Sequence, residues 1–244
     1  MALKHVQETY EKLGKDDPLY AVLSFRETKD NRWDPEAFFA RGRDEIRAGL
    51  DFLANLGIEP VRDRALDFGC GAGRLTQALC GEFEQAVGVD ISSSMIETAN
   101  RFNSHGERCS YLVNTTDHLP MLDDASFDFV YSNITLQHVP PEASTRYVAE
   151  FVRVLKPGGV ALFQLPDGPN HKPGSLGERW YALRRGPLRR FWKRVRGKAP
   201  VEIHYVSRER VQEVVESAGG EIADIRDDKT ARRGRRSLFY TVTR

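Results

Sequence analysis

Three glycines at alternate positions are the residues that point most directly to chemistry. Residues 66–74 read LDFGCGAGR, with Gly69, Gly71 and Gly73 between a short apolar run and a helical pattern. Glycine permits a tight turn and lets a ligand approach the backbone, because it has no Cβ. The pattern predicts a ligand-binding loop between a strand and a helix; the alternative is a tight turn that binds nothing.

Asp90 is the second residue of interest. It ends the next apolar run, 86–90, and follows Gly71 by 19 positions. An acid at the end of a second strand can accept hydrogen bonds from both hydroxyls of a ribose. The loop and Asp90 together predict a nucleoside site, whereas the competing interpretation is that Asp90 only caps the following helix.

A nicotinamide dinucleotide is the alternative ligand. Sites for such cofactors prefer the spacing Gly-x-Gly-x-x-Gly, because a pyrophosphate sits on the helix N-terminus. Here Gly73 comes one residue early and Arg74 stands in the position of the last glycine. The spacing therefore favours a nucleoside without phosphates and leaves a nicotinamide oxidoreductase as the third hypothesis.

The elements that must position these residues are short apolar strands alternating with helices. This alternation predicts a mainly parallel sheet covered on both faces, with ligands at the carboxyl ends of its strands. Residues 156–159 (KPGG) should break the chain between a helix and the fifth strand, and residues 232–236 should form a turn. The expected strands are 65–69, 86–90, 109–114, 127–132, 160–165, 221–226 and 237–243, and the expected helices are 35–53, 74–80, 92–99, 141–155 and 207–218.

Four segments, in this order, resemble the class I S-adenosylmethionine-dependent methyltransferases, in particular their type 11/25-like domains. They are LDFGCGAGRLT, VGVDIS, SFDFVYSNITLQHV and EFVRVLKPGGVALF, and the resemblance covers residues 65–165. We expect a doubly wound, Rossmann-like α/β fold of seven strands, the last antiparallel. Residues 1–58 would form an N-terminal helical cap and residues 59–244 the methyltransferase domain, with a basic insert at 167–200.

The resemblance implies S-adenosylmethionine as the cofactor and assigns roles by position. The loop would border the methionine part, with Asp67 near its amino group; Asp90 would hold the ribose and Ile91 would pack on adenine. The family's usual acid for the adenine amino group is replaced by Thr115, so Asn114, Asp117 or nearby backbone groups would serve. The expected cofactor-binding residues are Asp67, Gly69, Cys70, Gly71, Gly73, Asp90, Ile91, Thr115, Thr116, Asp117, Asn133 and Ile134.

His138 is the candidate general base for a hydroxyl acceptor, because it follows the fourth strand and histidine titrates near neutrality. The alternative is that it only packs on or caps the next helix; His171 and His204 are weaker candidates. Residues 133–136 read NITL instead of the Asn-Pro-Pro-Tyr signature of enzymes that methylate adenine or glutamine. The sequence therefore favours a small-molecule, glycan or lipid-linked acceptor.

Composition indicates the cellular compartment and bears on metal binding. The 244 residues are 40% hydrophobic, and the first seventeen contain no apolar stretch typical of a secretory signal. The three cysteines lack metal-ligand spacing, so we expect no metal and a reduced, cytoplasmic protein. The net charge of +1 conceals 19 basic and 10 acidic residues from Asp167 onward.

The remaining hypotheses concern the basic insert. Residues 184–198 contain eight basic residues and no acid, and a helix there would align Leu188, Phe191, Trp192 and Val195 on one stripe. Such a helix suits an interface or lid over an anionic acceptor, including peripheral contact with the inner face of a membrane. The alternatives are a solvated helix packed on its own domain, and contact with nucleic acid, which we disfavour.

We therefore expect a cytoplasmic S-adenosylmethionine-dependent methyltransferase, monomeric or homodimeric, that methylates an O or N nucleophile of a small molecule or glycan. The second hypothesis is a non-catalytic domain that binds the same cofactor for regulation, since Gly69, Gly71 and Asp90 alone do not exclude it.

Overall fold

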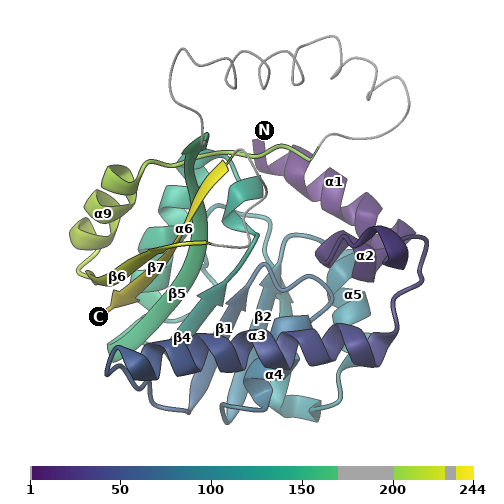
Figure 1. Ribbon diagram of the computed structural model, residues 1–244, viewed down its shortest axis with the longest axis horizontal. Coiled ribbons are helices and arrows are strands. Elements are labelled where there is room, and N and C mark those ends of the chain that lie inside the picture. The colour runs from purple at the N-terminus through teal and green to yellow at the C-terminus, as the bar shows by residue number, and fades with distance from the viewer. Residues whose placement is uncertain (1, 170–200, 229–234) are drawn as a thin grey trace.

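A computed structural model describes residues 2–169, 201–228 and 235–244 (Figure 1). The helices are α1 (Ala2–Asp16), α2 (Pro18–Val22), α3 (Pro35–Asn55), α4 (Arg74–Cys80), α5 (Ser93–Phe102), α6 (Pro141–Val154) and α9 (Arg208–Ser217), with short 3-10 turns at Arg26–Thr28, Gly106–Arg108 and Leu136–His138. The strands are β1 (Arg64–Phe68), β2 (Gln85–Asp90), β3 (Cys109–Val113), β4 (Phe127–Ser132), β5 (Leu155–Pro169), β6 (Glu221–Asp227) and β7 (Arg235–Thr243).

The described strands form one seven-stranded sheet in the order β3-β2-β1-β4-β5-β7-β6. The first five pair in parallel, and β7 runs antiparallel to both β5 and β6. This confirms the expected Rossmann-like α/β sheet with an antiparallel last strand. The strand order reverses next to β1, between β1 and β4, and ligands of such sheets bind where the carboxyl ends of the strands meet this switch point.

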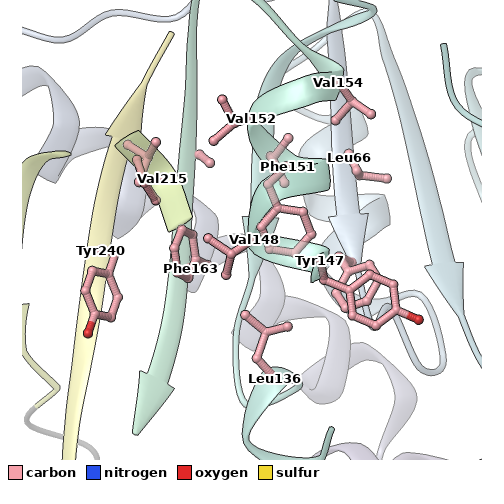
Figure 2. Close-up of a cluster of buried hydrophobic side chains, with 14 of the residues drawn as sticks. Leu66, Leu136, Tyr147, Val148, Phe151, Val152, Val154, Phe163, Val215 and Tyr240 are labelled. Carbon is pink, nitrogen blue, oxygen red and sulfur yellow. The ribbon is translucent and has the colours of Figure 1, made fainter. Parts of the chain in front are cut away.

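Neighbouring residues of the central strands β1, β2, β4 and β5 enter two different cores. Leu66 of β1 and Phe163 of β5 lie in the core beneath α6 and α9, and Figure 2 shows Val148 and Phe151 of α6 beside them. Ala65, the neighbour of Leu66, joins the opposite core beneath α3, α4 and α5. Helices cover both faces, as the near-continuous apolar strands predict.

Helix α3 belongs to the layer that covers the sheet. Asp34 caps it by accepting a hydrogen bond from the backbone of Ala37, and Pro35 occupies its first turn, as expected. Gly57, just beyond the helix, has a left-handed φ of 74°. Ile46 and Leu53 lie in the core shared with β1 and β4. Of residues 1–58, α3 is therefore part of the packed domain, while α1 and α2 lie across one end of the sheet (Figure 1).

Two expected boundaries are wrong. Strand β5 begins at Leu155, before the expected break, because Leu155 already pairs with Phe127. Residues 156–159 do interrupt the pairing: the register with β4 shifts there, Gly158 has a left-handed φ of 81°, and its amide donates to the carbonyl of Arg244. The second error concerns the expected turn at 232–236. Arg235 and Arg236 belong to β7 and pair with the end of β5, so they are not turn residues.

Several predictions fall outside the residues that the structure describes: His171, the basic helix at 184–198 with Leu188, Phe191, Trp192 and Val195, and residues 232–234 of the expected turn. Over residues 2–169, 201–228 and 235–244, no helix has both the length and the apolar content needed to cross a membrane.

The contact between α3 and α4 depends on Gly42. A Cβ there would lie 2.5 Å from the backbone oxygen of Arg74, so alanine must push the two helices apart. We expect Gly42→Ala to lower the free energy of unfolding by about 1–3 kcal/mol, measured by chemical denaturation. Gly49→Ala in the same helix, whose Cβ would meet only side-chain atoms, the nearest a methyl of Leu162 at 3.3 Å, should cost much less. Equal losses for the two variants would contradict this account.

Candidate active site

The glycine loop adopts a backbone that other residues rarely adopt. Gly69, Gly71 and Gly73 have φ angles of 79°, 51° and 80°. The loop is also closely packed: a Cβ at Gly69 would lie 2.1 Å from the side chain of Thr135, and one at Gly71 would lie 2.6 Å from that of Val22. Both the backbone conformation and the close packing therefore require glycine at positions 69 and 71.

Asp90 holds this loop against the end of β2. Its carboxylate accepts hydrogen bonds from the backbone amides of Gly71 and Ser92, both at 2.9 Å. Burial raises the pKa of Asp90, and the amide hydrogen bonds oppose that rise. A carboxylate has about four acceptor positions, so Asp90 retains capacity for both hydroxyls of a ribose. The arrangement fits a nucleoside at this point of the sheet.

A cavity opens at the carboxyl ends of β1, β2, β3 and β4, next to this loop. Of the residues expected at the site, those lining it are Gly69, Gly71, Asp90, Ile91, Asn114, Asn133, Ile134 and His138. Those that do not line it are Asp67, Cys70, Gly73, Thr115, Thr116 and Asp117. Sequence reasoning missed lining residues from the N-terminal helices, namely Leu3, Val6, Tyr10, Ala21 and Val22, and others around the cavity, namely Phe68, Val89, Met95, Thr135, Val139 and Tyr147.

Asp67 is buried and faces α4. One carboxylate oxygen accepts a hydrogen bond from Thr76 at 2.7 Å, and the other has no partner among the described residues. Burial raises the pKa of Asp67 to about 7, although the hydrogen bond from Thr76 and the charge of Arg74 oppose the rise. In this structure Asp67 lies behind the loop and does not line the cavity.

The loop after β3 presents Asn114 to the cavity. The Asn114 side-chain amide donates to the carbonyls of Thr116 and His118, both at 3.0 Å, which fixes its orientation. Asp117 instead pairs with Arg146 of α6. Asn114 is thus the residue of this loop that borders the cavity, and a role for Thr115, Thr116 or Asp117 in adenine recognition stays a prediction.

Glu45 of α3 organises the wall formed by the end of β4. It accepts hydrogen bonds from the Asn133 amide at 2.7 Å and the Tyr131 hydroxyl at 3.1 Å, and it pairs with the buried Arg74 at 2.7 Å. Ile134 follows with a φ of 62°, a strained conformation for a β-branched residue. Sequence reasoning missed Glu45, because a glutamate in an amphipathic helix carries no local signal of a distant partner.

The N-terminal helices close the cavity through Glu11. Its carboxylate accepts hydrogen bonds from the Ser92 hydroxyl at 3.0 Å and the Ser94 amide at 3.2 Å, at the N-terminus of α5. Burial opposes ionisation, but the hydrogen bonds from Ser94, Lys15 and Ser92 outweigh it and lower the pKa of Glu11 to about 2. The docking of α1 against α5 therefore depends on a carboxylate that caps a second helix.

Tyr10 of α1 lines the cavity beside His138. Its ring lies 5.7 Å from the ring of His138, measured between centroids. Burial raises the pKa of Tyr10, and the charge of Asp90 adds to the rise.

His138 lines the cavity in a defined tautomer. Its Nδ1 lies 3.0 Å from the backbone carbonyl oxygen of Glu202, and its Nε2 lies 3.1 Å from the amide nitrogen of Gln137. A carbonyl oxygen only accepts, so Nδ1 carries the proton and Nε2 is the basic nitrogen. The backbone amide of His204 donates to the carbonyl of Gln137 at 2.8 Å, which fixes the segment 201–206 beside the site.

Comparisons with known proteins agree with this geometry. Residues 66–163 match a family model described as a methyltransferase domain. Trans-aconitate 2-methyltransferase of Azoarcus sp. (strain BH72) is 31% identical over 147 residues, which cover 57% of this chain and 54% of that protein. Ubiquinone biosynthesis O-methyltransferase of Hahella chejuensis (strain KCTC 2396) is 30% identical over 146 residues, covering 59% and 60%. Magnesium protoporphyrin IX methyltransferase from Synechocystis PCC 6803, solved with bound SAH, superimposes with a TM-score of 0.62 at 18% identity, over 99% of both chains.

The fold, the loop and the matched domain define the class. Residues 66–163 match a methyltransferase domain, and the described sheet has the fold of the class I S-adenosylmethionine-dependent methyltransferases, which includes structures solved with bound SAM or SAH. The matched regions span little more than half the length of these two curated relatives, so what the whole protein does is a separate question.

Replacing Glu11 should loosen α1. Glu11→Gln removes the charge that the Ser92 and Ser94 donors stabilise, at a cost of about 1 kcal/mol for such a cap. We expect backbone amides of residues 2–16 to exchange with deuterium about five times faster, measured by mass spectrometry. Glu8→Gln, at an exposed position of the same helix, should leave exchange unchanged. If both variants behave alike, the carboxylate of Glu11 does not hold the helix.

Asp67 should make stability fall as pH rises. Its folded pKa is about 7 against 3.8 for an ordinary aspartate, so the folded protein retains a proton that the unfolded chain has lost between these values. Relative to wild type, Asp67→Asn should therefore gain about 4 kcal/mol in unfolding free energy between pH 4 and pH 8. Denaturation at both pH values measures this, with the exposed Asp44→Asn as the control. Parallel pH curves for wild type and Asp67→Asn would show that the carboxyl is ionised throughout.

Proposed function

We propose that this chain transfers the methyl group of S-adenosylmethionine to an oxygen atom of a small-molecule acceptor. The observation that carries the proposal is one cavity lined by the glycine loop, Asp90 and His138 together. The two curated relatives named above support it, because their names describe a trans-aconitate methyltransferase and an O-methyltransferase.

The cofactor supplies an electrophilic methyl group on a sulfonium, and the chain supplies position. Asp90 would accept hydrogen bonds from the ribose, while the left-handed backbone at Gly69 and Gly71 lets the methionine part approach the main chain. Asn133, held by Glu45, would form the wall beside the sulfonium. Fixing two reactants in line replaces the entropy loss of a bimolecular encounter and can contribute several kcal/mol.

His138 would act as the general base. Its Nδ1 proton is committed to the carbonyl of Glu202, and its Nε2 accepts a hydrogen bond from the side-chain amide of Gln137, so an acceptor hydroxyl would replace Gln137 at Nε2 before its proton moves there. A base placed in this way supports catalysis over the alternative of a purely regulatory cofactor-binding domain. The dinucleotide alternative is weakened by the position of Gly73, one residue too early for a pyrophosphate seat.

A lipid-linked or anionic glycan acceptor, and contact with a membrane surface, depend on residues 184–198, which lie outside the described part of the chain. They remain predictions from the sequence.

Asp90 gives the direct test of the cofactor site. Asp90→Asn should weaken S-adenosylmethionine binding at least tenfold in calorimetry, because hydrogen bonds to a charged group are worth about 1.5–3 kcal/mol each. Glu97→Gln, which removes an exposed charge from the nearby helix α5, should bind like wild type. Thermal unfolding of both variants checks that the loop anchored on Asp90 has not collapsed. Failure of wild type to bind, or equal affinity in a folded Asp90→Asn, would refute the cofactor assignment.

A further inference from the structure

A second cavity adjoins the first on the side of His138. It lies between α1, the residues that follow β4, and the segment 201–204. Val6, Tyr10 and His138 line both cavities, so the two cavities meet at these three side chains. A molecule in the second cavity can therefore reach the same imidazole that borders the cofactor cavity.

The second cavity has a mostly apolar lining, and the polar side chains in it include two glutamates. Glu142 and Glu202 line it together with His5, His138 and His204. Within the described part of the chain, no lysine or arginine is among its lining residues. Protein sites for carboxylates commonly use arginine or lysine, which form strong charge-assisted hydrogen bonds, whereas two glutamates repel an anion. Glutamate and imidazole instead suit hydroxyl groups, which both donate and accept hydrogen bonds.

The walls of the cavity are fixed by main-chain hydrogen bonds. The amide of His204 donates to the carbonyl of Gln137 at 2.8 Å, and the amide of Val206 donates to that of Pro166 at 3.0 Å. The carbonyl of Glu202 accepts the hydrogen bond from Nδ1 of His138. The segment that carries Glu202 and His204 therefore also orients the candidate base.

We propose that the second cavity binds the methyl acceptor and that this acceptor presents uncharged hydroxyl groups instead of carboxylates. The inference rests on the proposed function. Glu202 would accept a hydrogen bond from one acceptor hydroxyl, while another faces His138, where the second cavity meets the first. This hydroxyl would replace the side-chain amide of Gln137 at Nε2 of His138. The attacking oxygen forms its bond to the methyl carbon as the carbon–sulfur bond breaks. The hydroxyl proton passes to Nε2 of His138, and the sulfur leaves as a neutral thioether.

This differs from the anionic acceptor that the basic insert suggested. The difference arises because Glu142 and Glu202, which line the cavity, carry no recognisable signature in the sequence. It also separates this chain's acceptor from trans-aconitate, a tricarboxylate, the substrate in the name of one relative.

Transfer of a labelled methyl group tests the inference with probes of opposite character. Catechol, glycerol and methyl glucoside supply neutral hydroxyls, and trans-aconitate supplies carboxylates. We expect wild type to methylate at least one neutral probe and to show at least tenfold lower kcat/KM with trans-aconitate. Glu202→Gln should raise KM for the neutral probe about fivefold or more with little change in kcat, the pattern of lost substrate binding.

Controls separate this inference from the proposed function. Glu209→Gln, an exposed charge on α9 that does not line the cavity, should leave KM unchanged. Calorimetry with S-adenosylmethionine should give the same affinity for wild type and Glu202→Gln. If wild type fails to bind the cofactor, the proposed function fails. If it binds the cofactor but prefers trans-aconitate, transfers to no neutral probe, or keeps its KM in Glu202→Gln, the acceptor inference alone is overturned.

Discussion

The hydrogen bond from the amide of Gly71 to the carboxylate of Asp90 is the contact on which the rest of the site depends. It joins the turn after β1 to the end of β2, and the amides of Gly69 and Cys70 reinforce it by donating to the carbonyl of Val89 at 2.7 Å and 3.0 Å. Because β1 and β2 are parallel neighbours, both strands end at the same edge of the sheet. These hydrogen bonds therefore fix the conformation of the glycine loop at the switch point of the sheet.

Helices from distant parts of the chain complete the binding site through two glutamate side chains. Glu45 brings α3 against the end of β4 through Asn133, and Glu11 brings α1 against the start of α5 through Ser94. Each carboxylate accepts several hydrogen bonds, so its charge is compensated where it lies. The cavity therefore forms only when these helices pack against the sheet, although the loop that borders it is a local strand–turn–helix structure.

Local patterns explain what the sequence could predict. The glycine spacing, the cap at Asp34 and the alternation of strands and helices each act within a few residues, and the bounds of α4 and β4 were predicted correctly. The boundary errors at β5 came from Pro157, Gly158 and Gly159, which suggest a break unless the partner strand is known. Glu11, Glu45 and Tyr10 were missed because their partners lie far away in the chain, and an amphipathic helix does not disclose where it docks.

The placement of His138 depends both on local sequence and on a contact with a distant segment. A histidine following the fourth strand was predictable, but its tautomer was not, because that depends on the carbonyl of Glu202, 64 residues later. The same segment brings the Glu202 side chain into the second cavity. An imidazole whose basic nitrogen is defined is useful to a hydroxyl acceptor, which must lose a proton, and unnecessary for a carboxylate, which has none to lose at neutral pH. The orientation of His138 and the two glutamates of the second cavity therefore both support the proposed hydroxyl acceptor.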